Sequence, residues 1–192
     1  MNIVLQSKYI KMTLQQIGEK YGTDKATYHK YCDFYEINLP KTLNRLLEVG
    51  VHRGASIRMW REYYPNTEIV GIDINTPLHI EGVTILQMNS TNLHELEKLG
   101  KFDLIIDDGS HTMCDQQIFM NYALDNMLTE HGIFIMEDLH TSKNPEEWIH
   151  RGVTKTTVQV LKELESKYNI IYFDRSGNET DSYTSIIANK KL

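Results

Sequence analysis

The hydrophobic pattern of the chain predicts seven strands that alternate with helices. Short apolar runs between polar turns occur at residues 46–51, 68–74, 83–88, 101–108, 132–136, 169–174 and 182–189. Runs of this length are typical of buried strands, whereas 115–128 and 153–168 have apolar residues at helical spacing. Because strands that alternate with helices build a parallel sheet covered on both faces, we predict an α/β fold. The expected sheet is doubly wound, Rossmann-like and seven-stranded, with one antiparallel strand near its edge.

Residues 1–40 are expected to form a short helical extension in front of this sheet. A helix is predicted to begin behind Thr13, whose hydroxyl suits an N-cap, and a loop at 21–25 leads into the aromatic-rich segment 28–35. Two interpretations of the aromatic segment stay open: it packs on the edge of the sheet, or it forms a lid over a ligand. We therefore divide the chain into an extension or lid, 1–40, and a main domain, 41–192.

Composition and charge narrow the class of protein. The 192 residues are 41% hydrophobic and 24% charged, which is ordinary for a globular domain, and the net charge of -6 disfavours a nucleic-acid partner. The two cysteines lack C-x-x-C spacing, which favours packed thiols in a reduced compartment. Neither a signal-peptide pattern nor an apolar run of about 18 residues is present, so we predict a cytoplasmic protein without a membrane partner.

The first strand leads into a glycine turn and then a helix, the order found where nucleotides bind α/β sheets. Gly50 and Gly54 allow the backbone to approach a ligand closely, and the following helix offers free N–H donors. Their Gly-x-x-x-Gly spacing differs from the dinucleotide fingerprint and disfavours a dehydrogenase. Asp73, at the end of the second strand, is placed to accept hydrogen bonds from ribose hydroxyls. Polar residues from Asn89 onward are expected to meet a base.

Acidic and imidazole groups follow two further strands directly. The run 102–111 ends in Asp107, Asp108 and His111, and the run 132–140 presents Glu137 and Asp138 before a histidine. In an open parallel sheet, ligands bind outside the carboxyl ends of the strands. Because only two residues separate Asp108 from His111, one turn can aim both side chains at the same small volume. These two strand ends are the strongest functional signal in the sequence.

Together, these motifs resemble class I S-adenosylmethionine-dependent methyltransferases. Within that class the chain looks most like the metal-dependent, mycinamicin-type sugar O-methyltransferases and their cephalosporin-tailoring relatives. The resemblance rests on 21–25 with Tyr28 and His29, and on 47–51, 54–60, 71–73, 106–111 and 136–138.

The resemblance implies a site for S-adenosylmethionine and a Mg²⁺-like ion. Asp108, Glu137 and Asp138 are the implied metal ligands, and His111 is the implied catalytic base. The chemistry agrees, because a sugar hydroxyl must lose its proton during attack on the methyl group and carboxylate oxygens suit Mg²⁺. The implied cofactor contacts are Thr23, Lys25, Glu48, Gly50, Gly54, Ser56, Asp73, Asn89 and Asp107.

The function predicted on this basis is metal-assisted O-methylation of a sugar or a sugar-containing metabolite by a homo-oligomeric enzyme. A catechol-type O-methyltransferase and a non-catalytic subunit that only binds the cofactor remain alternatives. His140, just beyond the acidic pair, is interpreted as an ordinary loop histidine, and Trp60 as a core residue.

Overall fold

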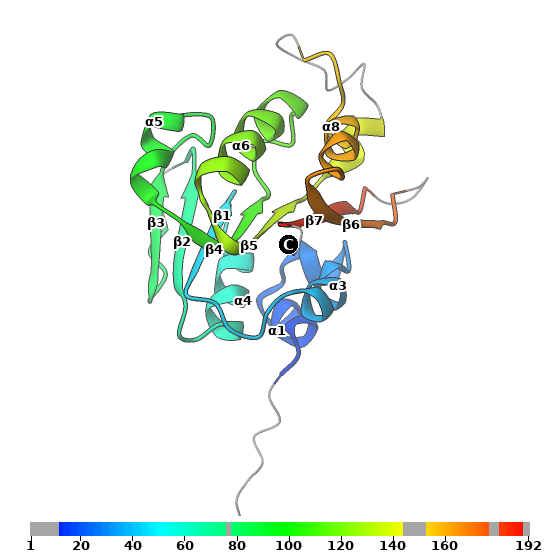
Figure 1. Cartoon of the computed structure of the whole chain (residues 1–192). Helices are drawn as coiled ribbons and strands as arrows, with labels where there is room; N and C mark the ends of the chain where they lie inside the picture. The colour runs from blue at the N-terminus through cyan, green and yellow to red at the C-terminus, as the bar shows by residue number, and fades with distance from the viewer. Residues whose placement is uncertain (1–11, 76–77, 144–152, 177–180, 190–192) are drawn as a thin grey trace, which may run out of the picture.

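The structure of the chain is a computed structural model that describes residues 12–75, 78–143, 153–176 and 181–189. Within these residues it forms a seven-stranded sheet of order β3-β2-β1-β4-β5-β7-β6 (Figure 1). The strands are β1 (Arg45–Val49), β2 (Glu68–Asp73), β3 (Val83–Gln87), β4 (Phe102–Asp107), β5 (Leu128–Met136), β6 (Tyr168–Asp174) and β7 (Tyr183–Asn189).

The first five strands are parallel, and β7 is antiparallel to both of its neighbours, β5 and β6. This confirms the predicted sheet with one antiparallel strand near its edge. The strand β5 begins four residues earlier than its apolar run, and the pairing of β4 with β5 shifts register between Phe102 and Leu104.

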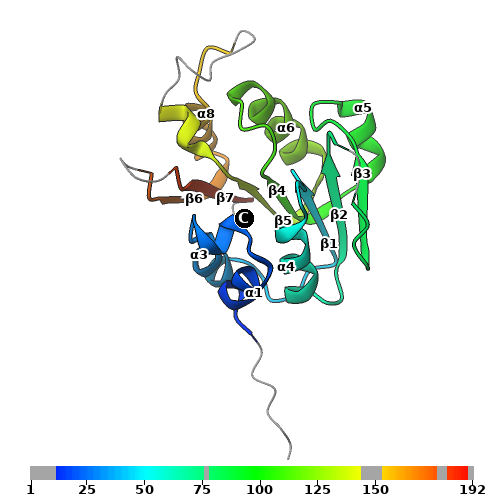
Figure 2. The same cartoon turned by 180° about the vertical axis from the view of Figure 1, so that it is seen from behind.

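Helices cover both faces of the sheet. They are α1 (Leu14–Tyr21), α2 (Asp24–Thr27), α3 (Tyr31–Asn38), α4 (Ala55–Tyr63), α5 (Leu93–Leu96), α6 (Met113–Asn126) and α8 (Thr157–Leu164), with 3-10 turns η1 (Glu97–Leu99) and η2 (Leu139–Lys143). Neighbouring residues of a strand point to opposite faces, so Leu46 belongs to one buried cluster and Leu47 to the other. One cluster includes side chains of α1, α3 and α4, and the other includes side chains of α5, α6 and α8. Figure 2 shows these two groups of helices on either side of the sheet.

The described part of the N-terminal extension packs into the first of these clusters. Thr13 caps α1 as expected, and its hydroxyl and the Gln16 side chain form a capping box. Leu14 and Ile17 from α1 lie buried in the same cluster as Trp60 of α4, which confirms Trp60 as a core residue. The α1 helix therefore shares a hydrophobic core with the sheet and α4.

Other details differ from the sequence expectations at element ends. The predicted helix 153–168 is α8, which is shorter and begins after the capping residue Thr156. The predicted helix 115–128 is α6, which starts two residues earlier behind Thr112. Cys32 and Cys114 are buried free thiols, as predicted. Among the described residues, no helix is both long and apolar enough to cross a membrane.

Candidate active site

The candidate residues lie at one edge of the sheet, where the parallel strands end. In the register of the sheet, Val49 of β1 lies opposite Asp107 of β4, and Asp107 lies opposite Met136 of β5. The residues that follow these strands therefore begin side by side. This arrangement explains why the two acidic runs, which are far apart in sequence, meet.

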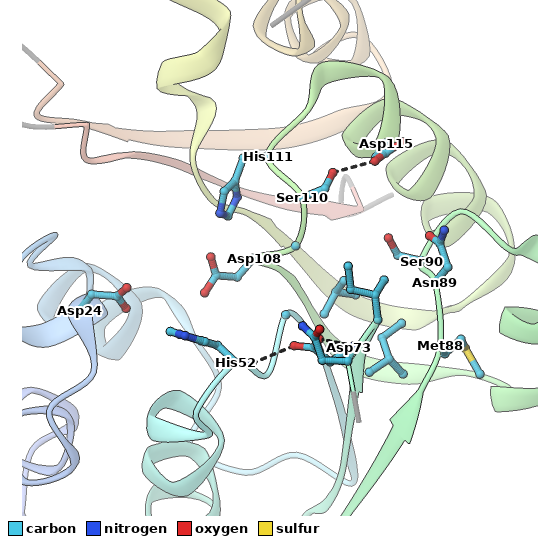
Figure 3. A pocket seen from close by; sticks show the side chains of 16 residues that line it. Asp24, His52, Asp73, Met88, Asn89, Ser90, Asp108, Ser110, His111 and Asp115 are labelled. Atoms are coloured by element: carbon cyan, nitrogen blue, oxygen red, sulfur yellow. Dashed lines mark hydrogen bonds between the residues drawn. The ribbon is translucent and has the colours of Figure 1, made fainter. Parts of the chain in front are cut away.

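A cavity of about 520 Å³ opens at this edge, between the loops that follow β1, β2, β3 and β4 (Figure 3). Gly50, Asp73, Asn89, Asp108 and His111 line it, as a ligand site built from those loops requires. A smaller cavity of about 270 Å³ shares Gly50 with the first and extends between α2 and the start of α4. Among the predicted cofactor contacts, Thr23 and Ser56 line this second cavity.

The glycine turn after β1 brings the backbone against the loop after β4. Gly50 has φ of 88°, and its N–H donates to the carbonyl of Ile72 at 2.9 Å. A Cβ atom at this position would lie 1.8 Å from the carbonyl oxygen of Asp108, so only glycine fits. Gly54, with φ of 76°, is the N-cap of α4 and shapes the turn outside the residues that line either cavity.

Asp73 is held in place at the end of β2 and faces the larger cavity. Its Oδ2 accepts hydrogen bonds from the N–H groups of Val51 and His52 at 3.0 and 2.9 Å, and its Oδ1 accepts from Asn75 (Figure 3). Partial burial raises the pKa of Asp73, but these hydrogen bonds hold it below its usual value. The carboxylate is therefore ionised, and its remaining lone pairs can accept from a ligand.

Three predicted cofactor contacts lie beneath the cavities instead of lining the larger one. Glu48 is fully buried, and its carboxylate accepts from Ser56 Oγ at 3.0 Å and from the Trp60 indole N–H at 3.3 Å. Lys25 is also fully buried, and Asp107 is buried with its Oδ1 accepting the Gly109 N–H. Burial raises the pKa of Glu48 to about 7 and that of Asp107 to about 8. These groups support the floor of the site.

A second feature of the edge is a group of three possible metal ligands. One ligand atom each from Asp108, His111 and Asp138 lies within 4.8 Å of the others. The His111 Nδ1 is 3.1 Å from the Asp138 Oδ2, and Figure 3 shows the His111 ring and the Asp108 carboxylate on the same side of their loop. His111 and Asp138 have positive φ angles of 59° and 54°, a conformation that residues other than glycine rarely adopt. Two carboxylates and an imidazole fit a Mg²⁺ or Mn²⁺ ion.

The structure does not bring Glu137, the third predicted metal ligand, into this group. Its N–H donates to the carbonyl of Asp107 at 3.0 Å, which continues the strand pairing by one residue. Its side chain points inward, where Oε2 accepts from Lys25 Nζ at 2.9 Å and Oε1 accepts from Tyr35 Oη at 2.9 Å. Burial raises the pKa of Glu137 well above its usual value, against the opposing charge of Lys25.

Two residues outside the predicted set lie at the site. Asp24 lines both cavities, and its place between Thr23 and Lys25 in the motif was the available signal. His140, interpreted as an ordinary loop histidine, has its Nδ1 3.5 Å from the Asp138 Oδ1. Burial raises the pKa of Asp138, but His140 and His111 hold it below its usual value, while Asp138 raises the pKa of His140. No sequence pattern indicated this contact.

Comparisons with known proteins agree with this architecture. No family model matches the chain. A tetracenomycin rhamnosyl 2'-O-methyltransferase of Streptomyces olivaceus is 28% identical over 182 residues, 85% of this chain and 48% of its own length. The mycinamicin VI 2''-O-methyltransferase of Micromonospora griseorubida is 28% identical over 152 residues, 70% of this chain and 38% of its own length. The chain thus spans about half, or less, of these relatives.

The solved structure of the MycE methyltransferase, in complex with Mg, SAH and mycinamycin VI, superposes with a TM-score of 0.78. The match covers 94% of this chain and 55% of that chain. At 20% sequence identity, it shows that the two chains share a fold. The resemblance inferred from the motifs is confirmed by these matches. The chain has the fold of the class I S-adenosylmethionine-dependent methyltransferases, and the two sequence relatives described above are O-methyltransferases.

Proposed function

We propose that the chain is an S-adenosylmethionine-dependent, divalent-metal-assisted O-methyltransferase that acts on a hydroxyl of a sugar or a sugar-containing metabolite. One observation carries the proposal. Asp108 and His111, two of the three convergent metal-ligand groups, line the same cavity as Gly50 and Asp73, the residues expected to meet the cofactor. A cofactor and an acceptor bound there would be neighbours, as methyl transfer by in-line attack requires.

The cofactor half of the cavity offers matching polar groups. S-adenosylmethionine would supply an activated methyl group. The ionised Asp73 is suited to accept from ribose hydroxyls, and Gly50 lets the main chain approach the ligand without a side chain between. Asn89 uses its Oδ1 to accept from Thr91, so its amide Nδ2 is the group left to contact a base.

The acceptor half can hold a hydroxyl group and remove its proton. Asp108 and Asp138 would hold a divalent cation, whose positive charge favours loss of a proton from a sugar hydroxyl. If His111 donates its Nδ1–H to Asp138, its Nε2 is left with a free lone pair. In that tautomer, Nε2 takes the proton as the general base.

His111 has two possible roles in this arrangement, because its ring is also close enough to serve as a metal ligand. The contact with Asp138 favours the base, since a carboxylate on one nitrogen fixes the tautomer and directs the other nitrogen. We assign it the base role and give Asp108 and Asp138 the metal.

The acceptor is proposed from the relatives, whose names describe methylation of sugars on tetracenomycin and mycinamicin. The net charge of -6 favours such a small acceptor over nucleic acid. We also propose that the chain self-associates, which sedimentation of the purified protein tests.

Calorimetric titration with S-adenosylhomocysteine, with and without Mg²⁺ and with NAD as the control, tests the cofactor. Micromolar binding of S-adenosylhomocysteine and none of NAD is the expected result. A screen with labelled S-adenosylmethionine then compares nucleotide sugars and glycosides with catechols. Transfer to catechols alone would favour the catechol-type alternative, and absence of cofactor binding would remove the methyltransferase proposal.

A further inference from the structure

Lys25 is a fully buried lysine that lies under the candidate metal site. Its ammonium Nζ donates to the Asp108 Oδ2 and to the Glu137 Oε2, the latter at 2.9 Å, and it lies 3.6 Å from the Glu48 Oε1. Glu48 lies on β1, whereas Asp108 and Glu137 directly follow the neighbouring strands β4 and β5. Lys25 itself lies on the short helix α2.

The charge of the Lys25 ammonium depends on the carboxylates around it. An isolated ammonium in the interior of a protein is costly, and it normally loses its proton. The carboxylates of Asp108, Glu137 and Glu48 surround the Lys25 ammonium and compensate its charge. Within the described part of the chain, Lys25 is the one lysine or arginine that pairs with these acids.

The contacts of Lys25 restrict two residues of the site. One Asp108 oxygen is occupied by the ammonium, which leaves the other oxygen for a cation. Glu137 is held between Lys25 and the Tyr35 hydroxyl, and it is not part of the group formed by Asp108, His111 and Asp138. A divalent cation at Asp108 would therefore share that carboxylate with a fixed positive charge.

We propose that Lys25 is a positioning residue of the metal site, a built-in counter-ion that holds Asp108 and Glu137 in the metal-free chain and weakens the binding of divalent cations. The inference rests on the proposed function, because it needs a divalent cation at Asp108. The repulsion between the ammonium and the cation lowers the affinity, and release of Glu137 would add a carboxylate to the site. The same contacts stabilise the folded chain before a cation binds.

The experiment measures Mn²⁺ binding through the electron paramagnetic resonance signal of the free ion, together with the melting temperature of the metal-free protein. Lys25→Met removes the charge and keeps most of the side-chain volume. We expect this variant to bind Mn²⁺ about tenfold or more tightly than the wild type, and to melt at a lower temperature without metal. Lys25→Arg, which keeps the charge, is expected to retain the wild-type affinity.

A second pair of variants covers the case in which Lys25→Met does not fold. In Glu137→Gln the ammonium still neutralises Asp108, whereas in the double variant Lys25→Met/Glu137→Gln it is absent. The double variant is expected to bind Mn²⁺ more tightly than Glu137→Gln alone. A lysine with only a structural role would leave the affinity unchanged or reduce it in both comparisons.

The outcomes separate the two proposals. If the wild type binds Mn²⁺ and S-adenosylhomocysteine but loss of Lys25 fails to tighten Mn²⁺ binding, the counter-ion role is overturned and the proposed function stands. If the wild type binds no Mn²⁺, the metal-assisted function and the counter-ion role are both overturned.

Discussion

Glu137 and Asp138 are adjacent acids that face in different directions. Glu137 still pairs with the neighbouring strand, so its side chain follows the alternation of β5 and points inward to Lys25. Asp138 then takes a positive φ, which ends the strand and turns its carboxylate toward His111. An acidic pair in the sequence therefore supplies one group to the interior and one to the candidate metal site.

Replacement of His111 tests its assignment as the base. His111→Ala is expected to lower kcat by about 10²–10⁴-fold, the range for loss of a general base, and to leave the affinity for S-adenosylhomocysteine nearly unchanged. Turnover kinetics and calorimetry measure the two effects, with exposed His94→Ala as the matched control. Full activity of His111→Ala would exclude the base role, whereas loss of Mn²⁺ binding would identify His111 as a ligand.

Asp138 is expected to bind the cation and to accept a hydrogen bond from His111. Asp138→Asn keeps the shape of the side chain but removes its charge and no longer fixes the His111 tautomer. We predict that Mg²⁺ no longer stimulates this variant, and that kcat falls by about 10²-fold or more. Assays across a Mg²⁺ series check this prediction. Unchanged stimulation would place the ion elsewhere.

At the scale of elements, the apolar runs were sufficient to predict all seven strands and the antiparallel strand near the edge. They predicted element ends less well, because caps such as Thr112 and Thr156 decide where a helix begins. The convergence of the strand ends was predictable, since parallel strands share a carboxyl edge. The burial of Lys25 against Asp108 and Glu137 was not, because these contacts join segments more than 80 residues apart.

Replacement of Gly50 tests the close packing of the turn between β1 and α4. Gly50→Ala forces a Cβ to within 1.8 Å of the Asp108 carbonyl oxygen at a φ of 88°. We expect a loss of more than about 2 kcal/mol in the free energy of unfolding, together with loss of S-adenosylhomocysteine binding.

Gly82→Ala is the matched control, because Gly82 has φ of 71° but its added Cβ would only touch the Arg61 side chain at 3.4 Å. Urea denaturation of both variants separates the cost of positive φ from the backbone clash. If both variants lose the same free energy of unfolding, the clash with Asp108 contributes nothing to the cost of Gly50→Ala.

For the whole molecule, the N-terminal helices and the sheet share one buried cluster. Leu14 and Ile17 of α1 lie in the same cluster as Leu46 of β1 and Trp60 of α4. The aromatic segment is joined to it as well, since Tyr31 and Tyr35 of α3 are fully buried there. We therefore expect the extension and the main domain to unfold together, even though the boundary predicted at residue 40 separates them in sequence.

Ile17→Ala tests this expectation. The side chain is 2% exposed, so its truncation should cost about 2–5 kcal/mol of unfolding free energy, as for other large-to-small core substitutions. Ile37→Ala makes the same chemical change on α3 at a side chain that is 82% exposed, and it should be nearly neutral. If the molecule unfolds as one unit, Ile17→Ala shifts a single transition seen equally by calorimetry and circular dichroism. A separate early transition that alone responds to Ile17→Ala would instead make α1–α3 an independently unfolding lid.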